Sequence, residues 1–435
     1  MMNDKNVFSP RILRPEDAQQ NWRWDRALAS PGFKQVDFET RVDFQRLRKY
    51  RLARTKNALK NSGLGALLLF DVNNIRYITG TKIGEWERDK LCRFALLAGD
   101  EEPFVWDFGS AAVHHQQNCD WLDPNKCLAG MTGMRGTVPP SVGLMKSHAE
   151  EIMSYLKEAG VADMPIGLDI AETAMFFELQ KSGMNIVDGQ QVMLDAREIK
   201  NIDEITLLNQ AATMVDGVYH MIYEELKPGV RENDIVALAN QMLYEMGSDD
   251  VEAINAISGE RCSPHPHNFT DRMFRPGDQA FFDILQSYQG YRTCYYRTFN
   301  VGVATPEQND AYIKCREWLD KAIELIKPGV STDTVAKVWP KAEEFGFSDE
   351  MQAFGLQFGH GLGLALHERP IISRLVSLEN PMEIKTGMVF ALETYCPAKD
   401  GVSAARIEEE VVVTDKGCKV ISLFPAEDLP IANRY

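Results

Sequence analysis

Three short motifs near the C-terminal end each place an ionisable side chain in an apolar, strand-like run. The first is Gly-His360-Gly-Leu-Gly, which continues to His367. The second leads four apolar residues into Glu393, and the third is Arg406-Ile-Glu408 followed by valines. Because side chains alternate between the faces of a strand, a carboxylate inside such a run points into a buried interior. Burying a carboxylate is costly unless a cation compensates it, so the three motifs together predict a metal site, although any one alone would fit a chance acid at a strand end.

A fourth acid lies upstream, in a sequence typical of a β-hairpin. Apolar residues lead to Asp283 at the end of one strand, and Gly290 marks the turn before the next. With His360, Glu393 and Glu408, it forms an oxygen-rich donor set that includes one imidazole. Such a set suits Mn, Fe, Co or Zn, and carboxylates shared between two ions would activate a water between them. The residues leave open whether one ion binds or two.

These motifs need a scaffold, and the chain is long enough for more than one domain. Its 435 residues, 44% hydrophobic and 25% charged, are ordinary for a soluble globular protein of two or three domains. Residues 1–40 are polar and contain prolines, and we expect an extended arm there. Residues 41–195 alternate helix and strand patterns, which indicates an α/β layer with a mainly parallel sheet. A long helical pattern then begins near 203, so we place the second domain at 196–435.

The pattern also predicts individual elements. In the first domain we expect a basic helix over 43–62, strands over 64–70, 94–98, 104–107 and 166–169, a helix over 148–159, and a long loop over 116–142. In the second, Lys-Pro-Gly-Val occurs at 227–230 and again at 327–330, each time between a helix end and a polar cap. This echo predicts an approximate twofold repeat, whose helix pairs cover one face of a curved sheet.

Charge and cysteine usage exclude several classes of function. The net charge of −16 argues against binding nucleic acid or an anionic membrane, since both attract basic surfaces. The chain opens without a secretory signal pattern and contains no apolar run of membrane-spanning length. Its eight cysteines are scattered without a C-x-x-C pair, which favours reduced thiols. We therefore expect a soluble cytoplasmic protein.

The C-terminal motifs resemble those of the "pita-bread" family, which includes creatinase, prolidase, aminopeptidase P and methionine aminopeptidase. The likeness spans about residues 45–425 and includes the Arg197…Lys200…Glu204-Ile run and the stretch from Asn74 to Gly80. It implies an α/β (α+β) fold class. In this fold a creatinase-like N-terminal domain precedes a pita-bread domain with a pseudo-twofold repeat, commonly in a homodimer.

The resemblance also implies a ligand set for a divalent metal. Family ligands carry over at Asp283, His360, Glu393 and Glu408, while His367 matches a histidine that contacts substrate and the tetrahedral intermediate. One position departs from the family: Cys294 lies where the two-metal peptidases have a second aspartate that bridges both ions. A thiolate ligand and a buried inert cysteine both remain open readings of Cys294.

Two histidines upstream of Asp283 are further candidates. His267 lies where the family has its substrate-binding histidine, in a run similar to that of creatinase, in which the histidine there serves as acid and base; His265 is the second choice. A structural role in this proline-rich loop is a competing interpretation. Tyr296 and Arg297 are candidate substrate contacts. With Tyr288, Tyr291 and Tyr295, Tyr296 would suit a cationic osmolyte through cation–π contacts, or simply pack in the core.

Three functions follow from this reading. The first is metal-dependent hydrolysis of a small C–N-bonded substrate, such as an Xaa-Pro dipeptide, with Glu393 as proton shuttle and His367 at the oxyanion. The second is an osmolyte enzyme of the same fold, either resembling creatinase or ectoine hydrolase or cleaving C–S bonds like the dimethylsulfoniopropionate lyases, although Leu285 and Cys294 replace two aspartates of the lyases. The third is an inactive binding protein, which the retained ionisable groups disfavour.

Overall fold

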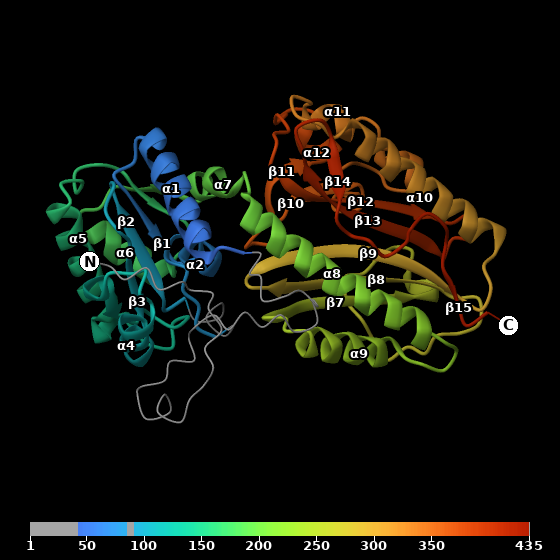
Figure 1. The fold of residues 1–435 in the computed structure, drawn as a ribbon, viewed down its shortest axis with the longest axis horizontal. Helices are drawn as coiled ribbons and strands as arrows, with labels where there is room; N and C mark the ends of the chain where they lie inside the picture. The colour runs from blue at the N-terminus through green and yellow to red at the C-terminus, as the bar shows by residue number, and fades with distance from the viewer. Residues whose placement is uncertain (1–41, 85–90, 435) are drawn as a thin grey trace, which may run out of the picture.

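The structure is a computed structural model that describes residues 42–84 and 91–434. The expected N-terminal arm, residues 1–40, lies outside the described residues. Figure 1 shows two regions joined through helices α7 and α8, with the N-terminal region to the left and the larger C-terminal region to the right. No helix in the described part of the chain is both long enough and apolar enough to cross a membrane.

The N-terminal region is one mixed sheet with helices around it. Its strands are β1 (Ala66–Leu69), β2 (Phe94–Ala98), β3 (Phe104–Asp107), β4 (Cys127–Ala129), β5 (Ile166–Leu168) and β6 (Ile186–Asp188), in the order β4-β3-β2-β1-β5-β6. Its helices are α1 (Phe44–Ser62), α2 (Val72–Thr79), α4 (Gly109–Asn118), α5 (Leu144–Glu158), α6 (Thr173–Lys181) and α7 (Gln190–Arg197). Helix α1 and the four predicted strands lie where they were expected.

Two expectations for this region need correction. The pairing is parallel for β3–β4, β1–β5 and β5–β6, but β2 runs antiparallel to both neighbours, so the sheet is mixed. The stretch 116–142 is not one loop, because it contains the end of α4 and the edge strand β4. Strand β4 has three residues and no alternation to reveal it, since only Cys127 of the three is buried.

The C-terminal region is built from two antiparallel-rich sheets and their covering helices. One sheet has the order β15-β9-β8-β7 and the other β11-β10-β12-β13-β14. The strands are β7 (Asp250–Ser258), β8 (Gln279–Tyr288), β9 (Tyr291–Val301), β10 (Phe358–Gly361), β11 (Glu368–Ile372), β12 (Val389–Pro397), β13 (Ala404–Val413), β14 (Cys418–Val420) and β15 (Ile431–Ala432). The helices are α8 (Ile202–Glu225), α9 (Glu232–Glu245), α10 (Pro306–Leu325), α11 (Thr332–Ala336) and α12 (Arg374–Ser377).

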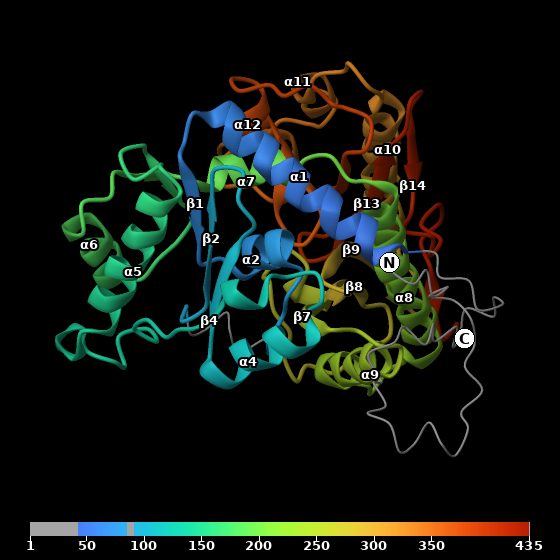
Figure 2. The same ribbon diagram turned by 60° about the vertical axis from the view of Figure 1, so that its left-hand side comes forward.

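The predicted twofold repeat is present in the backbone. Gly229 donates its N–H to the carbonyl of Phe274 at 3.0 Å, and Gly329, one hundred positions later, donates to Ile384 at 2.9 Å. Helices α8 and α9 pack on the sheet of β7, β8 and β9, while α10 packs on β12 and β13 (Figures 1 and 2). Each half therefore supplies one layer of helix over one antiparallel sheet.

The two sheets meet along β9 and β13, and side chains join them there. The Thr298 hydroxyl on β9 accepts the N–H of Arg406 on β13 at 2.8 Å and donates to the carbonyl of the same residue at 2.6 Å. Nearby, a carboxylate oxygen of Glu410 accepts the N–H of Cys294 at 2.6 Å. We call this line of contact the seam. It brings the hairpin of Asp283 next to the strand of Glu408.

Candidate metal centre

The predicted ligands come together at the seam from five different strands. Asp283 lies on β8, Cys294 on β9, His360 on β10, Glu393 on β12 and Glu408 on β13. All five residues are buried, none more than 6% exposed. Asp283 is in the interior of β8 and not at its end as expected, because β8 continues through five further residues to Tyr288. The alternation argument is unaffected, since Asp283 still faces the interior.

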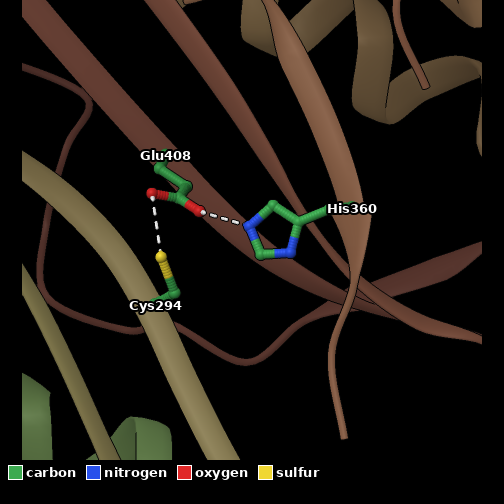
Figure 3. Close-up of side chains that lie close together, drawn as sticks. All are labelled: Cys294, His360 and Glu408. Atoms are coloured by element: carbon green, nitrogen blue, oxygen red, sulfur yellow. Dashed lines mark hydrogen bonds and ion pairs between the residues drawn. The ribbon is translucent and has the colours of Figure 1, made fainter. Parts of the chain in front are cut away.

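Three of these side chains present donor atoms to one point. A sulfur of Cys294, a ring nitrogen of His360 and a carboxylate oxygen of Glu408 all lie within 4.8 Å of one another. Figure 3 shows the Glu408 carboxylate between the other two, with Oε1 4.0 Å from His360 Nε2 and Oε2 4.0 Å from Cys294 Sγ. Oε1 of Glu408 is buried without a hydrogen-bond partner among the described residues. An orphaned buried carboxylate oxygen beside an imidazole and a thiol fits a bound cation.

The other two acids flank this point and have protein partners. Asp283 Oδ2 accepts a hydrogen bond from Asn255 at 3.0 Å, and Oδ1 lies 3.6 Å from Cys294 Sγ. Glu393 Oε1 is 3.5 Å from His360 Nε2, while Oε2 forms an ion pair with Arg406. Asn255 and Arg406 were not identified as site residues from the sequence. Only the β7–β8 register places Asn255 opposite Asp283, whereas Arg406 belongs to a motif that was already recognised.

Burial shifts the protonation of the whole cluster toward neutral forms. Desolvation raises the pKa of Asp283 to about 7, with the charge of Glu393 adding to it. Burial likewise raises the pKa of Glu408 and of the Cys294 thiol well above their ordinary values. Burial lowers the pKa of His360 to about 4. A divalent cation would reverse the shifts of the acids and the thiol, because it stabilises their anionic forms.

His367 lies at the accessible edge of the centre. Its ring centroid is 4.5 Å from that of His360, yet the side chain is exposed. Partial desolvation, with His360 next to it, lowers the pKa of His367 to about 4, so it is neutral at physiological pH. The following residue, Glu368, is buried and pairs with Lys200 at 2.9 Å and Arg197 at 3.3 Å. These contacts tie the His367 segment to the junction between the two regions.

His265 and His267 form a second imidazole pair on the same side. Their rings stack with centroids 4.3 Å apart, and His265 Nε2 lies 3.1 Å from the Tyr296 hydroxyl. Burial, with Arg406 adding to it, lowers the pKa of both histidines. Glu393 acts electrostatically on His267 in the opposite sense, so the pair lies beside the acids. The Tyr296 hydroxyl also accepts a hydrogen bond from Asn255, the partner of Asp283, at 3.3 Å, so it lies beside the acids.

Arg297 and three of the tyrosines are not brought to the centre. Alternation along β9 places Cys294 and Tyr296 on one face and Arg297 on the other, where it pairs with Glu409 at 2.9 Å. Tyr295 donates to Asp216 at 2.6 Å and Tyr291 to Glu204 at 3.0 Å, while Tyr288 lies at the strand end. The sequence-based assignment of Arg297 to substrate thus conflicts with strand alternation, and we leave it out of the site.

The position of His360 depends on the glycine that follows it. The strand register shifts between His360 and Gly361, and a Cβ added at Gly361 would overlap the carbonyl oxygen of Arg369 on the neighbouring strand. Gly361→Ala is expected to destabilise the protein by about 1–3 kcal/mol, because the two strands must move apart, and to weaken metal binding by displacing His360. Chemical denaturation and metal titration measure the two effects.

Gly217→Ala is the matched control, because Gly217 lies within helix α8 and has room for a side chain. A Cβ there would be 4.0 Å from its nearest atom, the Met246 sulfur. This substitution should stabilise slightly, since alanine favours a helix. Equal stability and equal metal affinity for Gly361→Ala and the natural chain would contradict the proposed dependence.

Two family models match the chain. The model described as Metallopeptidase family M24 matches residues 206–415, and the model described as Creatinase/Prolidase N-terminal domain matches residues 51–199. The two matches meet near residue 200, next to the end of α7. The M24 match contains every strand that carries a predicted ligand.

The chain is also similar to individual proteins along most of its length. It is 26% identical to a probable dipeptidase PepE of Mycobacterium tuberculosis over 389 residues, which cover 87% of this chain and 95% of that one. It is 24% identical to dimethylsulfoniopropionate lyase DddP of Roseovarius nubinhibens, covering 88% and 87%. The fold matches the solved structure of an Xaa-Pro dipeptidase from Bacillus anthracis with a TM-score of 0.71 at 19% identity, covering 88% and 99%.

Proposed function

The chain belongs to the creatinase, prolidase and aminopeptidase P pita-bread family, and from that premise we propose that it hydrolyses a C–N bond in a small substrate, a dipeptide foremost. The observation that carries this proposal is the Glu408 carboxylate, which lies between the Cys294 thiol and the His360 imidazole and keeps one oxygen, Oε1, without a hydrogen-bond partner among the described residues. A divalent cation is the group that such a donor set accepts. His367, an exposed side chain, lies beside His360, with ring centroids 4.5 Å apart.

The cation would be held within the set formed by Asp283, Cys294, His360, Glu393 and Glu408. Mn, Fe, Co and Zn all accept oxygen and imidazole ligands. A thiolate ligand favours Zn over Mn within this group. When bound, such an ion polarises a carbonyl and lowers the pKa of water, which makes water a nucleophile at neutral pH.

The residues of the chain supply positioning and proton transfer around that chemistry. Glu393 lies 3.5 Å from His360 and next to the imidazole pair, where its carboxylate can take a proton from the attacking water and return it to the leaving amine. His367 lies on the open side and can donate a hydrogen bond to the oxygen that gains negative charge. His267 can hold the far end of the substrate, or serve as a second acid and base.

His367→Ala is expected to lower kcat by about 100- to 1,000-fold, because a hydrogen bond to the developing oxyanion is lost. Metal content should stay unchanged, since His367 is outside the proposed ligand set. The control is His114→Ala, which removes another exposed imidazole, on α4 in the N-terminal region. Steady-state kinetics and metal analysis on both variants separate a catalytic role from a structural one. A His367 variant with natural kcat would remove the residue from the mechanism.

A second candidate function is cleavage of an osmolyte, including C–S cleavage. The similarity to a dimethylsulfoniopropionate lyase along 88% of the chain favours it. Creatine and ectoine are the corresponding C–N substrates. An inactive binding protein is disfavoured, because burying Glu408 with an unpaired oxygen serves no structural purpose.

The deciding test compares substrates on one metal-loaded preparation of the full chain. An Xaa-Pro dipeptide, a dipeptide without proline, creatine, ectoine and dimethylsulfoniopropionate are assayed before and after chelation. Chelator-sensitive cleavage of a dipeptide supports the proposal. Turnover of dimethylsulfoniopropionate with neither dipeptide cleaved would replace hydrolysis with lyase chemistry.

A further inference from the structure

We infer that the centre is built for a single divalent ion, held by Cys294, His360 and Glu408, while Asn255 engages Asp283 and the guanidinium of Arg406 engages Glu393. This inference rests on the proposed function, since it concerns the same centre. It adds the number of ions, the ligand that selects them and a charge-compensating role for Arg406.

The three acids of the centre fall into two groups. One carboxylate keeps an oxygen without a hydrogen-bond partner, and two are held by other protein groups. Glu408 keeps a buried oxygen without a hydrogen-bond partner. Oδ2 of Asp283 accepts a hydrogen bond from Asn255 Nδ2 at 3.0 Å. Glu393 is held by Arg406 through Oε2. The oxygen that is free to bind an ion therefore belongs to Glu408, next to the Cys294 sulfur and the His360 imidazole.

The second step is the placement of Arg406. Its side chain is 1% exposed, and its guanidinium carbon lies 4.2 Å from the centroid of the Tyr296 ring. Nη2 donates to the carbonyl of Gly355 at 2.7 Å and to Glu393, whereas Nε and Nη1 have no hydrogen-bond partner among the described residues. The charge is thus fixed in place and compensated by surrounding carboxylates. Arg406 thereby occupies Oε2 of Glu393, whereas Oε1 of Glu408 stays open to an ion.

The third step comes from the twofold repeat. The register pairs Asp283 with Tyr296 on one side of the seam and Glu393 with Glu408 on the other. Tyr296 therefore holds in its half the place that Glu408 holds in the other. A phenol, unlike a carboxylate, does not offer two anionic oxygens that two ions can share. The first half contributes one anionic ligand to the open point, the Cys294 sulfur.

The fourth step concerns which ion this set selects. One thiolate, one imidazole and one carboxylate make three protein ligands, the number that catalytic zinc sites combine with an open fourth position. Thiolate ligands favour Zn and disfavour Mn, which prefers carboxylate, carbonyl and water. The centre is therefore expected to bind Zn or Co more tightly than Mn.

The experiment loads the purified full chain with excess Co²⁺, removes unbound ion by gel filtration, and measures cobalt per chain and the near-ultraviolet absorption. We expect one ion per chain and a thiolate-to-cobalt charge-transfer band. Cys294→Ser should lose the band and bind the ion at least ~10-fold more weakly, by the scale of lost ligand interactions. Cys127→Ser is the matched control. Cys127 is also buried but lies in the N-terminal region, where its thiol donates a hydrogen bond to the Asp123 carbonyl. This variant should keep the band.

Two ions per natural chain, or one ion without the band, would overturn the inference, and neither result depends on a variant folding. The dipeptide assay on the same preparation keeps the two proposals apart. Two ions with dipeptide cleavage would refute the single-ion centre and leave the hydrolase intact. One ion with the band but no cleavage of any C–N substrate would support the centre and refute the proposed hydrolysis.

Discussion

Glu408→Gln is expected to lower kcat/KM for the dipeptide by at least ~1,000-fold, because a metal ion contributes several kcal/mol of transition-state stabilisation and each 1.36 kcal/mol is a factor of ten. The amide keeps the volume of the side chain but loses its negative charge. Metal content should fall in parallel, as measured by elemental analysis after gel filtration. Far-ultraviolet circular dichroism should stay unchanged, because the substitution is isosteric.

Glu410→Gln is the matched control for this experiment. Glu410 lies two positions further along β13, and its Oε1 accepts hydrogen bonds from the Thr293 hydroxyl at 2.7 Å and the Cys294 N–H at 2.6 Å. Burial raises the pKa of Glu410 to about 8, so its carboxyl is largely neutral at pH 7, and an amide replaces it closely. This variant should bind metal. If both variants kept metal and activity alike, Glu408 would not be a ligand.

Glu368→Ala is expected to lower the free energy of unfolding by about 3–5 kcal/mol, since it leaves two buried cations without their carboxylate. Lys200 and Arg197 reach Glu368 at 2.9 and 3.3 Å, and all three side chains are at most 2% exposed. Urea unfolding monitored by circular dichroism measures the loss as a shift of the midpoint. His367 directly precedes Glu368 in the chain. Its ring should therefore shift when Glu368 is removed, and kcat should fall as well.

Glu317→Ala supplies the comparison for an exposed ion pair. Glu317 and Lys321 are 3.9 Å apart on α10, and both are more than half exposed. Such a pair contributes little, so the urea midpoint should scarcely move. Equal midpoint shifts for the two substitutions would show that the buried network contributes no more than a surface pair.

The Glu368 network also predicts a dependence on pH. Burial by itself would raise the pKa of Glu368, but the charges of Lys200 and Arg197 outweigh burial and hold the pKa below its ordinary value of 4.5. A carboxyl whose pKa is lowered by folding stabilises the protein fully above its unfolded pKa, and that stabilisation is lost as the pH falls through the folded value. The natural chain should therefore lose stability below about pH 4.5 faster than Glu368→Ala does.

Much of the centre could be predicted because its ligands lie in short local patterns. Alternation within the runs around Glu393 and Glu408 was enough to point both carboxylates inward. The same rule, applied to β9, separates Cys294 and Tyr296 from Arg297 and would have kept Arg297 out of the substrate contacts. In the structure Arg297 lies on the opposite face of β9 and pairs with Glu409, because the assignment followed proximity in sequence and not the face of the strand.

The partners of the ligands could not be predicted in this way. Asn255 is opposite Asp283 only through a strand register that includes a bulge between Val251 and Ala253. A one-residue slip would have moved another side chain to that position. Arg406 was visible in its motif, but its pairing with Glu393 depends on the two neighbouring strands being in register across β12 and β13. Strand existence is a local property, whereas register is a property of the assembled sheet.

The seam affects the stability of the protein as well as its chemistry. Thr298 and Glu410 hold β9 and β13 together through side chains, while Cys294 and Glu408 approach the same point from opposite sides of that joint. An ion bound to Cys294 and Glu408 would link β9 to β13. A ligand at 100 times its dissociation constant stabilises the folded state by about 2.7 kcal/mol. Cells short of the ion would then lose the protein itself to proteolysis, and its abundance would follow metal supply.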